Sequence, residues 1–361
     1  MIIGVLNELD DPRVALSPET TAKLVKLGHE VHIEPGAGSR AAFPDSNYEE
    51  AGANTSSRET ILGAADFLAA ITPPSLEEMG KMKQDAMIVA MFNPLVEKDF
   101  ADSVASLPVR AFSMDRIPRT SIAQSMDVLS SMASMAGYKA VLVGANHLPG
   151  YMPMLMTAAG TIPPAKVLVL GAGVAGLQAI ATARRLGATV EAFDVRSAVK
   201  TEVQSLGAKF VEVEGAKEDD AAGGYAVEQS EEYKQRQSEL IQERATKADI
   251  VISTANIPGR KAPVLIKENT VHNMKPGAVI VDLAAATGGN CALTENDKVI
   301  QVNGVTIVGK SNLPAEMPNH ASKLYSNNVL NFFKFMTKEG PDQVDLSHEI
   351  FEKTRIVSAT S

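Results

Sequence analysis

Three glycines near the middle of the chain are spaced as in a turn that binds a dinucleotide. The segment 171–176 reads Gly-Ala-Gly-Val-Ala-Gly, follows the apolar run 166–170 and opens a helical stretch that ends near Gly187. In this pattern the first glycine allows the tight turn, the second lets a pyrophosphate approach the backbone, and the third lets the helix press on the strand. The helix N-terminus attracts the phosphate charge. The predicted cofactor-binding residues of this turn are Gly171, Gly173, Val174, Ala175 and Gly176.

An acidic residue closes the next predicted strand. Asp194 follows the strand predicted over 189–193 and stands 18 residues after Gly176. A carboxylate in this position accepts hydrogen bonds from both hydroxyls of the adenosine ribose and repels a 2′-phosphate, so it favours NAD(H) over NADP(H). Val195 and Arg196 belong to the same predicted site, although an arginine here can also serve a 2′-phosphate. The alternative interpretation is a structural glycine turn followed by a surface aspartate.

A second polar group lies in a helical pattern predicted from about 121 to 142. Gln124, Asp127 and Ser131 are three to four residues apart, so this spacing places them on one helix face, with Arg119 just ahead. From the residues alone two interpretations stay open. The group either has a function or only caps the helix and forms a solvated polar face.

Composition limits the classes of function. The chain has 361 residues and a net charge of −9, and it contains no dense run of Lys or Arg, so we expect no nucleic-acid partner. Its one cysteine, Cys291, has no His or other base nearby in sequence and is interpreted as a buried side chain. We predict no metal site. No stretch of about 20 uncharged apolar residues exists, so we expect no membrane span.

The elements that must position these residues alternate between strand and helix. This rhythm predicts an α/β fold with two Rossmann-like parallel-sheet domains, joined by long helices, with the cofactor in the cleft between them. Residues 1–130 and 318–361 form the first, discontinuous domain, and residues 131–317 form the Rossmann domain. A helix over 322–336 is expected to return to the first domain. The acidic, glycine-rich stretch 214–230 predicts a long mobile loop. The predicted strands are 2–6, 30–34, 65–71, 86–92 and 109–113 in the first domain and 166–170, 189–193, 209–212, 250–254, 278–283 and 305–309 in the second.

Several long motifs resemble one protein family over nearly the whole chain. They resemble the NAD(H)-binding component, domain I, of proton-translocating nicotinamide nucleotide transhydrogenase. The motifs are the segments 13–19 (Arg-Val-Ala-Leu-Ser-Pro-Glu), 119–139, 158–167, 171–176, 221–226 (Ala-Ala-Gly-Gly-Tyr-Ala), 255–263 and 282–291.

The resemblance implies a role for each matching residue. Arg119, Gln124, Asp127 and Ser130 would hold the nicotinamide end of NAD(H), and the first three are the expected catalytic residues. Gln124 would reach toward NADP(H) on a partner subunit. Tyr225 would close the mobile loop over the cofactor, and the matching segment 255–263 adds Ala255 and Asn256 to the site.

The implied reaction is direct hydride transfer from NADH bound to this chain to NADP⁺ bound on another subunit. Such a step needs aligned rings and excluded water, but no general acid or base. The resemblance implies a homodimer that works with NADP(H)-binding and membrane-spanning transhydrogenase subunits. It places the chain on the cytoplasmic or matrix side, attached to the membrane through those partners. Two departures from the family pattern are Ala285-Ala286-Thr287, where a more polar residue is usual, and Glu316, where relatives often have Arg.

Two other functions are compatible with this kind of fold. Alanine dehydrogenase shares the fold and the motif at 13–19, but it needs a Lys, a His and an Asp to bind the amino acid and move protons. The corresponding stretches here, 69–73, 91–94 and 285–286, contain none of the three, which argues against oxidative deamination. The second alternative is a non-enzymatic NAD(H) sensor or binding module.

Overall fold

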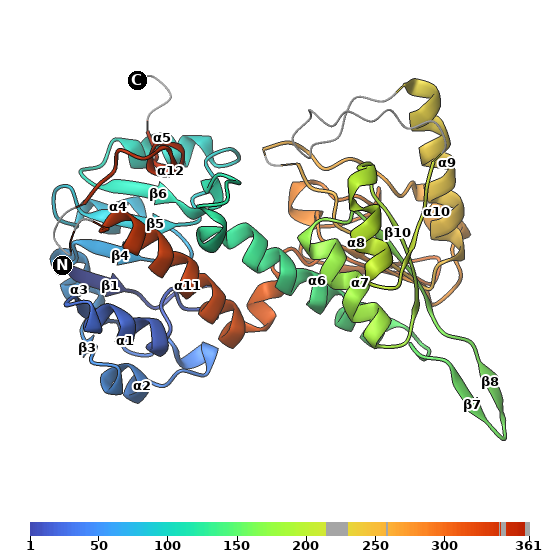
Figure 1. The fold of residues 1–361 in the computed structure, drawn as a ribbon, viewed down its shortest axis with the longest axis horizontal. Helices are drawn as coiled ribbons and strands as arrows, with labels where there is room; N and C mark the ends of the chain where they lie inside the picture. The colour runs from blue at the N-terminus through green and yellow to red at the C-terminus, as the bar shows by residue number, and fades with distance from the viewer. Residues whose placement is uncertain (214–229, 258, 339, 341–343, 358–361) are drawn as a thin grey trace. The chain divides into compact units, whose positions relative to one another are not determined.

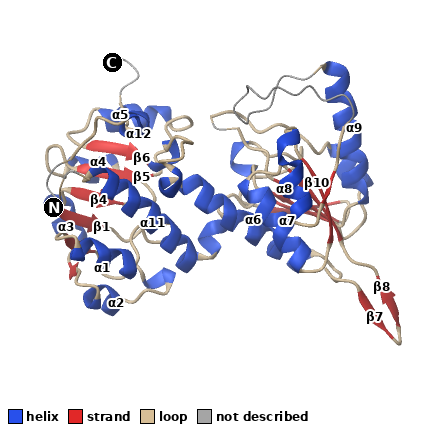
Figure 2. Cartoon of the chain, viewed as in Figure 1, coloured by secondary structure: helices blue, strands red, loops and turns tan. Residues whose placement is uncertain are grey.

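The structure is a computed structural model that describes residues 1–213, 230–257, 259–338, 340 and 344–357 (Figure 1). The chain divides into two compact units. Unit 1 consists of Met1–Met132 and Pro314–Ser361, and unit 2 consists of Ala133–Leu313. Each unit is built around one main sheet with helices packed on it (Figure 2). The predicted α/β class with two parallel-sheet domains is confirmed.

The sheet of unit 1 has six parallel strands in the order β3-β2-β1-β4-β5-β6. The order reverses between β1 and β4, as in doubly wound folds, whose ligands bind beyond the carboxyl ends of the strands. The strands are β1 (Ile2–Val5), β2 (Glu30–Ile33), β3 (Asn54–Thr55), β4 (Phe67–Ala69), β5 (Met87–Ala90) and β6 (Arg110–Ser113). The helices are α1 (Pro18–Lys26), α2 (Asp45–Glu50), α3 (Arg58–Ala64), α4 (Leu76–Gly80), α5 (Lys98–Ala105), α11 (Pro318–Met336) and α12 (Glu349–Thr354).

Local sequence signals explain where α1 begins and how α11 is held. Ser17 is the N-cap of α1: its hydroxyl accepts the Thr20 N–H at 3.3 Å, and a proline at the first helical position fits the capped turn. The helix predicted over 322–336 starts earlier, at Pro318, which is again a proline in the first helical turn, although no side chain caps this helix. Its buried face carries Tyr325, whose hydroxyl donates to the Ala70 carbonyl at 2.7 Å.

The sheet of unit 2 has seven strands in the order β11-β10-β9-β12-β13-β15-β14, and all pairs are parallel except β14 with β15. Its order reverses between β9 and β12. The strands are β9 (Lys166–Leu170), β10 (Thr189–Phe193), β11 (Lys209–Phe210), β12 (Ile250–Ser253), β13 (Val279–Asp282), β14 (Val299–Val302) and β15 (Val305–Val308). The helices are α7 (Val174–Arg185), α8 (Lys200–Ser205), α9 (Glu231–Lys247) and α10 (Glu268–Asn273), together with most of α6 (Val128–His147).

The helix α6 has the length and apolar composition of a helix that crosses a membrane, although no membrane span was expected from the sequence. A core helix of a folded domain meets the same criterion, and α6 packs within unit 2. Ala140 and Val141 are buried in its core. A Cβ at Gly137 would lie 2.0 Å from the Ala175 carbonyl oxygen, so glycine allows α6 to approach the start of α7.

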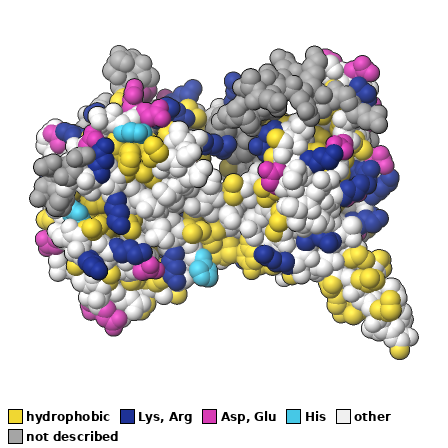
Figure 3. All heavy atoms as spheres, viewed as in Figure 1, with side chains coloured by type: hydrophobic (Ala, Val, Ile, Leu, Met, Phe, Trp, Pro, Cys, Tyr) yellow, Lys and Arg dark blue, Asp and Glu magenta, His cyan; other side chains and the backbone are white. Residues whose placement is uncertain are grey.

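Unit 2 also carries a hairpin that the sequence analysis did not predict. Its antiparallel strands are β7 (Leu155–Thr157) and β8 (Gly160–Ile162). Met156 is 74% exposed, and Figure 3 shows apolar side chains along the hairpin. The hairpin lacks the alternation of apolar and polar residues that marks a half-buried strand, which explains why the sequence pattern missed it.

Candidate functional site

The glycine-rich turn joins β9 to α7 at the carboxyl edge of the unit 2 sheet. Gly171 has a φ of +98°, a conformation that side chains rarely adopt, and a Cβ there would lie 2.4 Å from the Thr254 hydroxyl oxygen. Its N–H donates to the Phe193 carbonyl at 2.8 Å, which ties the turn to the end of β10. The turn therefore lies where β9, β10 and β12 end together.

The other two glycines have different roles. A Cβ at Gly176 would lie 1.8 Å from the Gly171 carbonyl oxygen, so glycine is needed for α7 to pack on the turn. A Cβ at Gly173 would meet no atom within 4 Å, so the space above this residue is open. Gly173 is the N-cap of α7 and provides no side-chain cap, and Val174 at the first position is 46% exposed. No side chain therefore caps the first N–H groups of α7, and the position beside Gly173 is open, which suits an anionic ligand.

Asp194 lies beside this turn and is buried. Its carboxylate accepts the Ala172 N–H at 2.7 Å and the Arg196 N–H at 2.9 Å, and the Arg196 guanidinium donates to both of its oxygens at 2.9 Å. Burial acts to raise the pKa of this carboxyl, but hydrogen bonds from Arg196 and Ala172 outweigh it and hold the pKa below its ordinary value. Asp194 is therefore a carboxylate at neutral pH. Val195, the next residue, is partly exposed.

The opposite wall of the site is fixed by a side chain that the sequence analysis did not single out. Asn290 is fully buried; its Oδ1 accepts the Ala255 N–H at 3.0 Å, and its Nδ2 donates to the carbonyls of Ala255 and Pro263, each at 2.8 Å. Asn290 thereby holds the segment that follows β12. Asn256, which follows Ala255, accepts a hydrogen bond from the Thr287 hydroxyl at 3.1 Å.

Asp282, also missed, organises the loop that carries Asn290. Its carboxylate accepts the N–H groups of Ala284 at 3.0 Å, Asn290 at 2.7 Å and Cys291 at 2.9 Å, and the Thr294 hydroxyl at 2.6 Å. Both residues lie in the segment 282–291, which the sequence analysis matched as a motif without assigning roles. Cys291 is buried, as predicted, and burial raises the pKa of its thiol, so it is not an activated nucleophile.

The polar group around Gln124 lies in unit 1 and differs from its predicted form. The prediction of one shared helix face is wrong, because α6 begins only at Val128 and a 3₁₀ turn spans Gln124–Met126. Asp127 directly precedes α6. Its Oδ1 accepts the Ser130 N–H at 2.9 Å, and its Oδ2 accepts the Ser130 hydroxyl at 2.6 Å. A short acidic side chain that bonds the backbone three residues ahead is typical of a helix start.

Arg119 and Gln124 are both exposed, and within the described residues neither side chain makes a hydrogen bond or ion pair. The 3₁₀ turn that begins at Gln124 is tethered to α11. The carbonyl of Ser125 accepts hydrogen bonds from Asn328 at 2.9 Å and Asn331 at 3.1 Å, both on α11. The structure thus brings Arg119, Gln124, Asp127 and Ser130 into one short segment, with two side chains free to bind and two engaged with each other.

Comparison with known families covers both units. The model described as "Alanine dehydrogenase/PNT, N-terminal domain" matches residues 4–136, and "Alanine dehydrogenase/PNT, C-terminal domain" matches residues 140–360. The chain belongs to the alanine dehydrogenase/PNT family.

Relatives within this family resemble the chain to different degrees. The first part of the NAD(P) transhydrogenase alpha subunit of Rhodospirillum rubrum is 47% identical over 330 residues, which cover 89% of this chain and 86% of that protein. The structure of transhydrogenase from Sinorhizobium meliloti has a TM-score of 0.91 at 42% identity and covers 99% of this chain and 98% of the other. Alanine dehydrogenase of Mycobacterium tuberculosis is 27% identical over 350 residues, which cover 94% of this chain and 88% of that protein. The resemblance to transhydrogenase is confirmed, and alanine dehydrogenase is a more distant relative.

A buried charged cluster at the carboxyl edge of unit 1 was also missed from sequence. The Glu8 carboxylate accepts the N–H groups of Ile71 at 2.6 Å and Thr72 at 3.2 Å. Burial is the main cause that raises the pKa of Glu8 to about 7, and the nearby Asp11 carboxylate adds to it. Asp11 in turn forms a buried ion pair with Arg13 at 2.5 Å. The signal was present in the motif 13–19 and in the acidic residues just before it.

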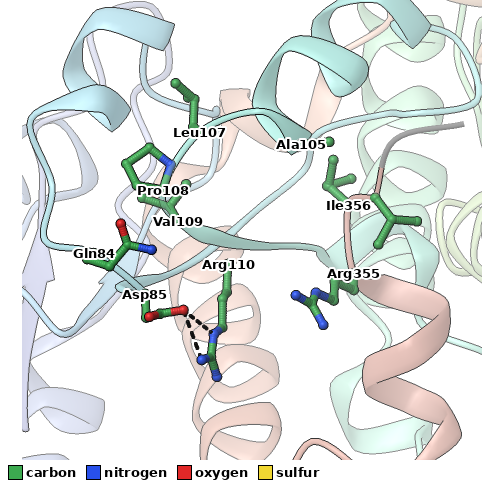
Figure 4. A pocket seen from close by; sticks show the side chains of 10 residues that line it. Gln84, Asp85, Ala105, Leu107, Pro108, Val109, Arg110, Arg355 and Ile356 are labelled. Atoms are coloured by element: carbon green, nitrogen blue, oxygen red, sulfur yellow. Dashed lines mark hydrogen bonds and ion pairs between the residues drawn. The ribbon is translucent and has the colours of Figure 1, made fainter. Parts of the chain in front are cut away.

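A separate cavity of about 350 Å³ lies at the edge strand of unit 1 (Figure 4). The Asp85 carboxylate on its wall accepts hydrogen bonds from the Arg110 guanidinium at 2.9 and 3.1 Å. Both residues stand where β5 and β6 begin, at the amino edge of the sheet. In open parallel sheets ligands bind at the opposite, carboxyl edge. The cavity is therefore not the candidate site.

Two further predictions concern a tyrosine and metal binding. Tyr225 lies outside the described residues. Among the described residues no cluster of His, Cys, Asp and Glu could hold a metal ion. In unit 2 the candidate site therefore consists of the turn at 171–176, the surroundings of Asp194 and the segment after β12. The segment that begins at Arg119 is a separate polar group in unit 1.

Proposed function

We propose that this chain is the NAD(H)-binding component of a proton-translocating transhydrogenase. It binds NAD(H) on the turn between β9 and α7, and it works with a partner subunit that binds NADP(H). The observation that carries the proposal is the open helix N-terminus above Gly173 beside the buried carboxylate of Asp194. Identity of 47% to a transhydrogenase subunit supports it.

The residues of unit 2 fit the two halves of the adenosine diphosphate group. Phosphate oxygens would accept from the free N–H groups at the start of α7, where Gly173 leaves room for them. The adenosine ribose would donate to Asp194, whose charge disfavours a 2′-phosphate. Val195, Arg196, Ala255 and Asn256 would line the same subsite.

The nicotinamide end is assigned to the segment of unit 1 that begins at Arg119. Arg119 and Gln124 have side chains available for a ligand, and Gln124 would reach toward the NADP(H) ring of the partner. Asp127 and Ser130 fix the start of α6 behind them through two hydrogen bonds. In this role the protein aligns the ring and excludes water, and it supplies no acid or base.

When bound, the dihydronicotinamide supplies a hydride. That hydride would pass to the nicotinamide of NADP⁺ on the partner, so NADH and NADP⁺ would become NAD⁺ and NADPH. No proton is taken up or released at the two rings. Proton movement therefore belongs to a membrane-spanning partner. The proposed assembly holds a homodimer of this chain on the cytoplasmic or matrix side of the membrane, attached through its partners.

The test combines the purified chain with an NADP(H)-binding transhydrogenase domain and follows hydride transfer from NADH. We expect turnover only when both proteins are present. Saturable NADH binding without turnover would leave the sensor function standing instead. Formation of NADH from L-alanine and NAD⁺ by the chain alone would favour the alanine dehydrogenase function.

A further inference from the structure

The carboxylate of Asp194 has no free acceptor position. Each of its oxygens accepts one backbone N–H and one guanidinium N–H, at distances of 2.7 to 2.9 Å. A carboxylate offers about four lone-pair positions in all. In this structure the side chain proposed to bind the ribose is therefore saturated by the protein itself.

Two of these four hydrogen bonds come from backbone N–H groups and two come from a side chain. The N–H of Ala172 comes from the glycine-rich turn, and the N–H of Arg196 comes from the backbone directly after β10. The other two come from the guanidinium of Arg196, whose side chain is 31% exposed, whereas the Asp194 side chain is 6% exposed. Only the guanidinium can leave without disturbing the backbone.

We propose that Arg196 is a latch on the adenosine-ribose subsite, because its guanidinium occupies the two acceptor positions that the two ribose hydroxyls use. Binding of NAD(H) displaces the guanidinium from Asp194. Once released, the guanidinium provides positive charge near the 2′ position, so Arg196 also limits discrimination against a 2′-phosphate. This inference rests on the proposed function, since it takes Asp194 as the ribose-binding residue.

The surroundings of Arg196 set the strength of the latch. Its two parallel bonds to one carboxylate are charge-assisted and well oriented. Its exposure lets solvent screen the pair, which weakens the closed state. Glu202, on α8, also stabilises the charge of Arg196 at longer range and gives the released guanidinium a second anionic neighbour. From these opposing effects we expect the latch to weaken NADH binding about threefold to tenfold.

The experiment measures NADH and NADPH affinity of the full chain by calorimetry, with melting curves to verify folding. Arg196→Met keeps the length of the side chain but donates no hydrogen bond. It should bind NADH about threefold to tenfold more tightly and NADPH more weakly. Arg196→Gln, which has a shorter donor, should tighten NADH binding less. An NADH analogue that lacks the adenosine 2′-hydroxyl should gain less from Arg196→Met, because it needs fewer acceptor positions.

Lys200→Met is the matched control. Lys200 has similar exposure and pairs with Glu212 at 2.5 Å, without touching Asp194. Loss of a positive charge there should leave the affinity for the anionic NADH unchanged or lower it. Tighter NADH binding by Arg196→Met, together with unchanged or weaker NADH binding by Lys200→Met, supports the latch. Unchanged or weaker NADH binding by Arg196→Met overturns it while the proposed function stands, provided that Asp194→Ala weakens binding. Failure of the unmodified chain to bind NADH overturns both.

Discussion

Gly176 faces the carbonyl oxygen of Gly171 so closely that a Cβ at position 176 would lie 1.8 Å from that oxygen. This contact fixes α7 against the turn that follows β9. Gly173, three residues earlier, faces open space instead. Gly176 is therefore needed for helix packing, whereas Gly173 leaves room for a ligand.

Substitution at these two glycines should have different consequences. Gly176→Ala should lower the free energy of unfolding by about 1–3 kcal/mol, because the added methyl overpacks the contact with Gly171. Gly173→Ala should change the free energy of unfolding by less than about 1 kcal/mol but weaken NADH binding, because the methyl enters the space proposed for the pyrophosphate. Urea unfolding and NADH titration of both variants test this. Equal effects of both variants on both measurements would contradict the assignment.

Removal of the Asp194 carboxylate should change cofactor choice. The unmodified chain should bind NADH far better than NADPH. Asp194→Ala should weaken NADH binding about tenfold or more, because charge-assisted hydrogen bonds to the ribose are lost. It should narrow the difference between NADH and NADPH, because the repulsion of a 2′-phosphate disappears. Titration with both nucleotides measures the ratio. Equal affinities in the unmodified chain would refute the claim.

The strands and turns of this fold follow largely from short-range pattern. β9 and β10 span the residues predicted for them. β9 is mostly apolar, β10 alternates between polar and apolar residues, and each has a glycine close to one end. α1 begins directly after Ser17, a serine cap followed by a proline, which is a local sequence signal. Short edge elements were missed: β14 pairs antiparallel at the sheet edge, and half-exposed strands carry little hydrophobic pattern.

The details of the candidate site were harder to predict. The turn at 171–176 is recognisable from sequence because Gly171 and Gly176 stand where a side chain would clash. Asp194 is recognisable because an acidic residue after the second strand belongs to the same sequence pattern. The pair between Asp194 and Arg196, and the clamp that Asn290 places on Ala255, depend on side-chain rotamers and on contacts between residues far apart in sequence. The helix predicted from residue 121 begins only at Val128. The Asp127 side chain accepts a backbone N–H and so marks the start of the helix at this later point.

Glu8 should make stability depend on pH. The pKa of Glu8 is about 7 in the folded chain and near 4.5 when unfolded, so the folded state holds the proton more tightly. The stability from this proton is present below about pH 4.5 and is lost as pH rises through 7, by on the order of 3 kcal/mol. Glu8→Gln cannot ionise. The difference in free energy of unfolding between Glu8→Gln and the unmodified chain should therefore shift in favour of the variant as pH rises from 5 to 8. Urea unfolding at both pH values measures this gain. Glu59→Gln, at an exposed position, is the control, and a constant difference for Glu8→Gln would contradict the prediction.

Gln124 offers the sharpest test of the proposed hydride transfer. Its side chain is exposed and makes no hydrogen bond within the described residues, so Gln124→Asn should leave thermal stability and NADH affinity nearly unchanged. Direct transfer requires the two nicotinamide rings at about 3–3.5 Å, and one shortened positioning group can slow it about a hundredfold.

The measurement is single-turnover hydride transfer to NADP⁺ on the partner domain, alongside NADH titration and thermal melting. Gln84→Asn is the matched control, because Gln84 is also an exposed glutamine of unit 1 but lines the cavity at the amino edge of the sheet. The control variant should transfer hydride at the normal rate. If Gln124→Asn does so as well, Gln124 does not position the rings, and the assignment of the segment after Arg119 to the nicotinamide end fails.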